Sequence, residues 1–126
     1  MSLAQKFTRT FGAVYILIGV IGFIDVVGGT TSQTGTKLIG IFGITLAHNV
    51  VHLAIGAAFL AGSSSDANAR MTSTAIGALY LLVGVIGLFN LDFINDLLFI
   101  NGADNVLHLG TGALAVAVGS GKLATA

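Results

Sequence analysis

Apolar residues along the chain fall into four long stretches that polar and charged residues separate. The stretches run from about residue 10 to 27, 38 to 61, 72 to 91 and 97 to 119. An α-helix needs about 20 mostly apolar residues to cross the hydrocarbon core of a bilayer. None of the stretches alternates between apolar and polar residues as a membrane β-strand does. The pattern therefore predicts an all-α integral membrane four-helix bundle.

The composition strengthens this prediction. Of the 126 residues, 55% are hydrophobic and only 8% are charged, whereas an average soluble domain has about 25% charged residues. The mean hydropathy is +0.97. A soluble domain of this size has too much surface for its volume to bury so many apolar side chains. We therefore expect the chain to be embedded in a lipid bilayer, which is its expected partner.

The basic residues predict an orientation, because Lys and Arg are concentrated in cytoplasmic loops. If the amino terminus is inside, four of the five basic residues lie inside and only Lys37 lies outside. Residues 62–70 then form an inner loop. Lys6 and Arg9 precede the first stretch as basic residues precede the apolar core of a signal peptide. We reject this interpretation, because the third stretch repeats the pattern of the first one deep inside the chain. We expect a multi-pass protein of the bacterial plasma membrane with both termini cytoplasmic.

Several function classes are disfavoured. The formal net charge is zero, and no basic cluster marks a nucleic-acid surface. Cysteine is absent, so disulfides and thiolate ligands are excluded. No nucleotide-binding loop and no motif for a catalytic nucleophile is present. The sequence favours a protein that is not an enzyme.

The chain contains an internal repeat. Residues 11–23 match residues 76–88, and residues 49–57 match residues 105–113. Each copy holds two crossings, so both copies point the same way. This predicts two parallel-repeat helix hairpins with pseudo-twofold symmetry along the membrane normal.

The two repeats, about residues 10–61 and 72–119, are expected to form a single four-helix transmembrane domain over residues 1–126. Small residues recur on one face of the first and third helices, where they allow close helix packing in lipid. These residues are Gly12, Gly19, Gly22, Gly77, Gly84 and Gly87. The same face carries Tyr15 and Tyr80, which are expected to anchor the helices at the inner interface.

Polar residues recur at matching places in the second and fourth helices. This polar seam consists of His48, Asn49, His52, Asp104, Asn105 and His108. The first and last members in each helix are four residues apart and share one face. Ionisable residues inside a membrane segment normally face the protein interior, so the two sets should meet inside the bundle.

Three interpretations of the polar seam remain open. Its side chains can simply hydrogen-bond between the helices and hold the two halves in register. Alternatively, His48, His52, Asp104 and His108 form a four-ligand set for Zn²⁺, Fe²⁺ or Mn²⁺. As a further possibility, chains of Asp and His in membranes often mark paths for protons or small solutes.

Haem is a second cofactor candidate. The matching residues His52 and His108 can ligate haem iron from both sides. Asn49 and Asn105 are adjacent candidates for cofactor binding. Gly56 and Gly112, one turn further on, leave room for a macrocycle.

Two motifs resemble a known family. One is the run 38–42 leading into 48–53 and then Gly56; the other is the run 103–109 with Gly112. Both are similar to the second and fourth helices of a bacterial membrane family catalogued as domain of unknown function 4383. The resemblance implies a four-helix plasma-membrane protein and carries no activity, cofactor or substrate with it.

Taken together, these observations predict a small polytopic membrane protein that uses the seam to bind a metal ion or haem. It is expected to act as an accessory subunit of a larger membrane complex or as a homo-oligomer. The alternatives are a small transport or proton-relay protein and a purely structural membrane partner.

Overall fold

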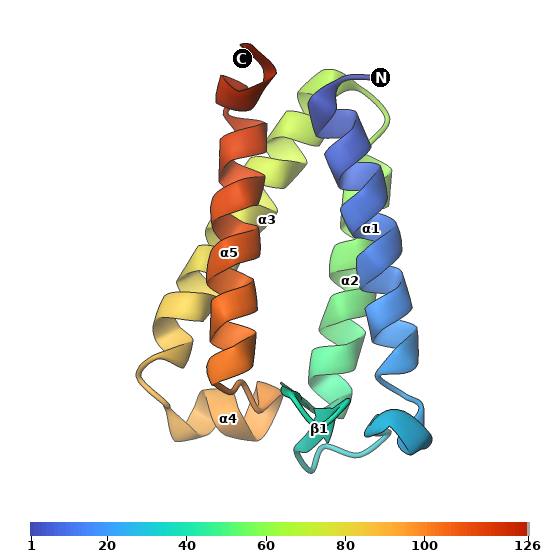
Figure 1. Cartoon of the computed structure of the whole chain (residues 1–126), viewed down its shortest axis with the longest axis vertical. Helices are drawn as coiled ribbons and strands as arrows, with labels where there is room; N and C mark the ends of the chain where they lie inside the picture. The colour runs from blue at the N-terminus through green and yellow to red at the C-terminus, as the bar shows by residue number, and fades with distance from the viewer. Residues whose placement is uncertain (126) are drawn as a thin grey trace.

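A computed structural model describes residues 1–125, which fold mainly into α-helices (Figure 1). The α-helices are α1 (Leu3–Ile21), α2 (Leu46–Gly62), α3 (Asp66–Gly87), α4 (Asp92–Leu98) and α5 (Gly102–Gly119). The short elements are a hairpin of β1 (Thr36–Leu38) and β2 (Phe42–Ile44) and the 3-10 helices η1 (Asp25–Val27) and η2 (Lys122–Thr125). The predicted helical class is confirmed, with the addition of the hairpin.

The four long helices run along the length of the molecule (Figure 1). Helix α1 packs beside α2, and α3 packs beside α5. The hairpin and α4 lie together at one end of the bundle, and we call these segments, residues 36–44 and 92–98, the crown. Both termini and the α2–α3 turn lie at the opposite end.

Two helices begin at the crown with a side-chain cap. The Thr45 hydroxyl accepts a hydrogen bond from the backbone N–H of His48, at the start of α2. The Asn101 side chain accepts one from the backbone N–H of Asp104, at the start of α5. Such caps satisfy backbone donors that have no partner within the helix. They place His48 and Asp104 in the first turn of their helices, next to the crown.

The helices start and stop at different places from the apolar stretches. The second stretch was expected to be helical from residue 38, but its first part forms the hairpin. Its turn contains Ile39 and Gly40 at positive φ (48° and 75°), a conformation that no α-helix contains. The fourth stretch begins inside the last turn of α4, and Phe99, also at positive φ, separates that turn from α5. Apolar composition alone does not separate these cases.

Many large apolar side chains lie on the surface of the bundle. Among the described residues, α3 is the one helix long and apolar enough to cross a membrane by length and composition, and α2 is a shorter apolar helix. Large apolar side chains are exposed on all four long helices, among them Leu17, Val50, Leu82 and Val106. The length and composition of one helix are weak support for membrane association, and the exposed apolar side chains also support it.

Glycines let the paired helices approach closely. A Cβ atom at Gly12 of α1 would lie 3.0 Å from the carbonyl oxygen of Gly56 in α2. A Cβ atom at Gly77 of α3 would lie 2.9 Å from the carbonyl oxygen of Gly112 in α5. The predicted role of these glycines in close helix packing is therefore confirmed. Residues at matching places in the sequence make matching contacts.

Candidate metal centre

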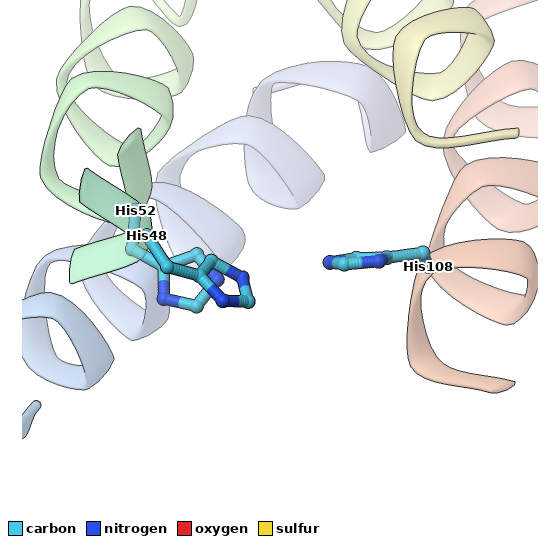
Figure 2. Close-up of side chains that lie close together, drawn as sticks. All are labelled: His48, His52 and His108. Carbon is cyan, nitrogen blue, oxygen red and sulfur yellow. The ribbon is translucent and has the colours of Figure 1, made fainter. Parts of the chain in front are cut away.

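Three histidines meet between the two helix pairs, near the crown. His48 and His52 lie one turn apart on α2 and point toward His108 on α5 (Figure 2). The ring centroid of His48 lies 4.5 Å from that of His52 and 5.9 Å from that of His108. One ligand nitrogen from each ring lies within 4.8 Å of the other two. The prediction that these residues face one another inside the bundle is confirmed for this histidine cluster.

The crown fixes the orientation of the His48 ring. Its Nδ1 lies 2.9 Å from the carbonyl oxygen of Leu98, the last residue of α4. The last carbonyls of a helix have no partner within the helix. Because a carbonyl only accepts hydrogen bonds, Nδ1 carries the proton and donates it. The lone pair is therefore on Nε2, as in a histidine prepared by its backbone partner to bind a metal ion.

Other residues of the first half hold the same end of α4. The Thr45 hydroxyl donates to the carbonyl oxygen of Leu97 at 2.7 Å. The Gln33 side-chain nitrogen donates to the carbonyl oxygens of Asp96 and Leu97, at 2.9 and 2.6 Å. The position of the His48 ring is thus part of a larger contact between the first half and α4.

Asp104 makes the reciprocal contact from the second half. Its Oδ2 accepts hydrogen bonds from the backbone N–H groups of Gly43 in β2 and of Asn101, each at 2.9 Å. The Asn101 side chain donates to the carbonyl oxygen of Ile41 in the hairpin. Asp104 therefore ties the hairpin to α5. It lies outside the histidine cluster, so its predicted role as a metal ligand stays a prediction.

Each of the two asparagines of the seam contacts a glycine at the end of the neighbouring helix of its own pair. The Asn49 amide nitrogen donates to the carbonyl oxygens of Gly22 and Thr30, at 2.6 and 3.1 Å. Asn105 packs against Gly87, as Asn49 packs against Gly22. The structure thus gives both asparagines a packing role, and cofactor binding by them stays a prediction.

Sequence reasoning missed two tyrosines beside the cluster. The Tyr15 ring lies 5.6 Å from that of His52, the Tyr80 ring lies 5.2 Å from that of His108, and the tyrosine rings are 5.5 Å apart. Both side chains are buried in the bundle, and their expected role as anchors at the membrane interface stays a prediction. Their position in the glycine stripe was the available signal, because that face packs against the neighbouring helix.

A cavity of about 220 Å³ lies beside the cluster. Its polar lining comes from Tyr15, His52, Asp104 and His108, and its other walls are apolar. The apolar lining residues are Ile18, Ile21, Leu38, Ile39, Phe42, Ile44 and Leu107. A smaller cavity of about 40 Å³ touches all three histidines from the side of α3. The cluster is therefore flanked by open space on two sides.

Two imidazole nitrogens are left without partners. Nδ1 of His52 and Nδ1 of His108 are buried and make no hydrogen bond within the described residues. An unsatisfied buried polar atom costs about 1–3 kcal/mol. A bound ion or molecule that engages these rings would therefore stabilise the fold.

A family model covers nearly the whole chain. Residues 5–120 match the family model described as Domain of unknown function (DUF4383). The chain belongs to this family. The match to DUF4383 extends from α1 through α5 and includes the three histidines. No curated protein and no solved structure matches the chain.

Proposed function

We propose that this DUF4383 protein is a multi-pass membrane protein that binds a transition-metal ion through His48, His52 and His108. The observation that carries this proposal is the convergence of three imidazoles from two helices, with ligand nitrogens within 4.8 Å of one another. The contact of His48 Nδ1 with the carbonyl oxygen of Leu98 supports it, because the proton on Nδ1 leaves the lone pair on the other ring nitrogen, Nε2.

The ligand type restricts the metal. The chain has no cysteine, and imidazole ligands suit zinc, copper, iron and nickel. Three nitrogens bound to one Zn²⁺ at about 2.0–2.1 Å lie about 3.3 Å apart in tetrahedral geometry. The nitrogens of the cluster, which lie within 4.8 Å of one another, would have to move closer together to bind one ion. Cavities adjoin the cluster, so a fourth coordination position could stay open, as in zinc sites that keep one position for a water or substrate.

The geometry favours an ion over haem. A macrocycle held between His52 and His108 needs a flat slot between those two rings. The ring centroid of His48 lies 4.5 Å from that of His52 and 5.9 Å from that of His108. It therefore obstructs the slot. The same ring serves an ion as a third ligand.

Membrane insertion is part of the proposal. The exposed apolar side chains and the apolar helix α3 support it. The matching contacts of Gly12 and Gly77 support two parallel repeats related by a pseudo-twofold axis along the membrane normal. Both termini lie at one end of the bundle (Figure 1), in keeping with cytoplasmic termini in a bacterial plasma membrane.

The partners of the protein are also a proposal. Exposed apolar helix faces contact either lipid or the helices of other chains. A bundle this small with one metal site fits an accessory subunit of a membrane complex or a homo-oligomer better than an enzyme. Transport or proton relay and a purely structural role are the competing functions.

The test is elemental analysis with a UV–visible spectrum on protein purified in mild detergent without chelator. We expect about one transition-metal ion per chain, lost in a His52→Ala/His108→Ala double variant. Asp104→Asn is the matched control, because the amide oxygen can still accept hydrogen bonds at the crown. Retention of the ion by Asp104→Asn assigns binding to the three histidines, and its loss adds Asp104 as the fourth ligand.

Two outcomes would contradict the proposal of an ion. A folded wild-type protein that is free of metal, and that takes up none on addition of Zn²⁺, Cu²⁺ or Fe²⁺, would leave the cluster a structural contact. A haem absorption band that disappears in the double variant would assign haem to the site instead.

A further inference from the structure

We propose that the cavity of about 220 Å³ beside His52 and His108 binds a small neutral ring compound with an oxygen atom at one end, of the phenol or quinone class. This inference goes beyond the metal site and does not depend on it, since the walls and the polar groups exist without an ion.

The size of the cavity sets the size of the ligand. An apolar cavity of about 150 Å³ inside a protein holds a molecule of benzene. The larger volume here admits a compound of one or two fused rings. The aromatic ring of Phe42 and the branched side chains of Ile18 and Leu38 give it apolar walls. A flat, uncharged ring system matches these walls, whereas a charged molecule would lose its hydration among them.

The polar residues of the lining favour a ligand with an oxygen atom. His52 and His108 both line the cavity, and each has a buried Nδ1 without a partner. A neutral imidazole offers one N–H donor and one nitrogen acceptor, so it serves a hydroxyl as well as a carbonyl oxygen. The acceptor oxygens of Asp104, also in the wall, disfavour an anion. The ligand is therefore neutral.

The position of the cavity provides an entrance from the surroundings. Two of its lining residues, Ile39 of the hairpin turn and Leu107 of α5, are 58% and 47% exposed. The cavity thus extends to an apolar part of the molecular surface, between the crown and α5. Neutral ring compounds partition from water into apolar surroundings, so they reach this entrance readily.

Two neighbouring positions on α1 allow a paired test with tryptophan, a residue that the chain does not contain. Ile18→Trp places a large ring in the cavity, whereas Leu17→Trp places the same ring on the exposed face of α1, where Leu17 is 57% exposed. The probes are 2-naphthol and naphthalene, which share a shape and differ by the oxygen. Binding is measured by equilibrium dialysis with chelator present, against protein-free micelles of the same detergent.

We expect saturable binding of 2-naphthol to the wild type and to Leu17→Trp. Binding should be at least about tenfold weaker for Ile18→Trp, because the cavity is filled. Naphthalene should bind the wild type at least about tenfold more weakly than 2-naphthol, since it leaves the imidazole nitrogens unpaired. Circular dichroism checks that Ile18→Trp is folded, and Leu107→Trp, which fills the cavity from its exposed edge, replaces it if it is not.

The proposal is overturned if 2-naphthol shows no saturable binding or binds equally well when the cavity is filled. Equal binding of the two probes would overturn the assignment of an oxygen to the ligand. Because chelator is present throughout, failure here leaves the metal proposal untouched, and failure of metal binding leaves this result unaffected.

Discussion

The imidazole Nδ1 of His48 lies 2.9 Å from the carbonyl oxygen of Leu98 and donates a hydrogen bond to it. This contact joins the first turn of α2 to the last residue of α4, which belongs to the other half of the chain. One nitrogen of the ring is therefore committed to the fold, and the other, Nε2, carries the lone pair that a metal ion would bind. Stability and the proposed metal binding both depend on this one side chain, and substitutions can separate them.

His48→Asn and His48→Ala should differ in stability and agree in metal binding. The amide nitrogen of Asn takes approximately the place of the ring Nδ1 and still donates to Leu98, but no atom replaces Nε2. We expect metal affinity to fall by more than about 100-fold in both variants, since even a residue that only supports a ligand is worth about 10–100-fold. The metal-free His48→Ala protein should also lose about 1–2 kcal/mol of unfolding free energy.

Metal titration and chemical unfolding of the two metal-free proteins measure the two effects. The wild type is the reference for both. Wild-type metal affinity in His48→Asn would show that His48 is not a ligand, and equal stability of the two variants would show that the contact with Leu98 contributes nothing.

Thr45→Val should loosen the contact between the two halves. The Thr45 hydroxyl accepts from the backbone N–H of His48 and donates to the carbonyl oxygen of Leu97, and valine has nearly the same shape without either bond. We expect a loss of about 1–2 kcal/mol in unfolding free energy. Thr10→Val, at an exposed position of α1, is the control. A Thr45→Val protein as stable as this control would rule out a stabilising role for the two bonds.

The convergence of the three histidines was predictable from the sequence. The spacing of His48 and His52 puts both rings on one face of a helix, and the repeat places His108 at the position that matches His52. The cost of polar groups in an apolar segment turns that face inward. Spacing, repeat and burial therefore suffice for the cluster, and the same reasoning identified the packing role of Gly12 and Gly77.

The crown was not predictable by the same reasoning. Residues 38–44 and 97–100 belong to apolar stretches that continue without a break into α2 and α5, so composition does not show the chain reversals at Gly40 and Phe99. The role of Asp104 depends on where α5 begins, because its bonds to Gly43 and Asn101 exist only when it is in the first helical turn. Long-range contacts between two irregular segments decide both features.

Gly112→Ala and Gly110→Ala should change stability in opposite directions, although the residues are two positions apart on α5. A Cβ at Gly112 would lie 2.9 Å from backbone atoms of Gly77 and Leu81, which cannot move without separating α3 from α5. We expect this variant to lose about 1–3 kcal/mol. A Cβ at Gly110 meets no atom within 4 Å, so alanine there should gain about 0.5–1 kcal/mol through its helix propensity.

Unfolding in detergent, followed by circular dichroism, gives both values in one experiment. A Gly112→Ala protein as stable as Gly110→Ala would contradict close packing of α3 against α5. Loss of stability in both variants would instead mean that the exposed face of α5 is buried against another chain.

The proposed orientation predicts which end of the bundle is accessible from outside the cell. The chain has no cysteine, so single cysteines can be introduced without a background. Thr34→Cys lies in an exposed segment at the crown end, and Ala67→Cys lies in an exposed position beside the α2–α3 turn, at the end that holds the termini. A maleimide that does not cross membranes should label Thr34→Cys on intact bacterial cells and label Ala67→Cys only after lysis. The reverse pattern would contradict the proposed orientation. Four of the five basic residues would then lie outside, against the usual preference of Lys and Arg for the cytoplasmic side. Labelling of both cysteines on intact cells would contradict a membrane crossing between the crown and the termini, since the two ends would then be on the same side.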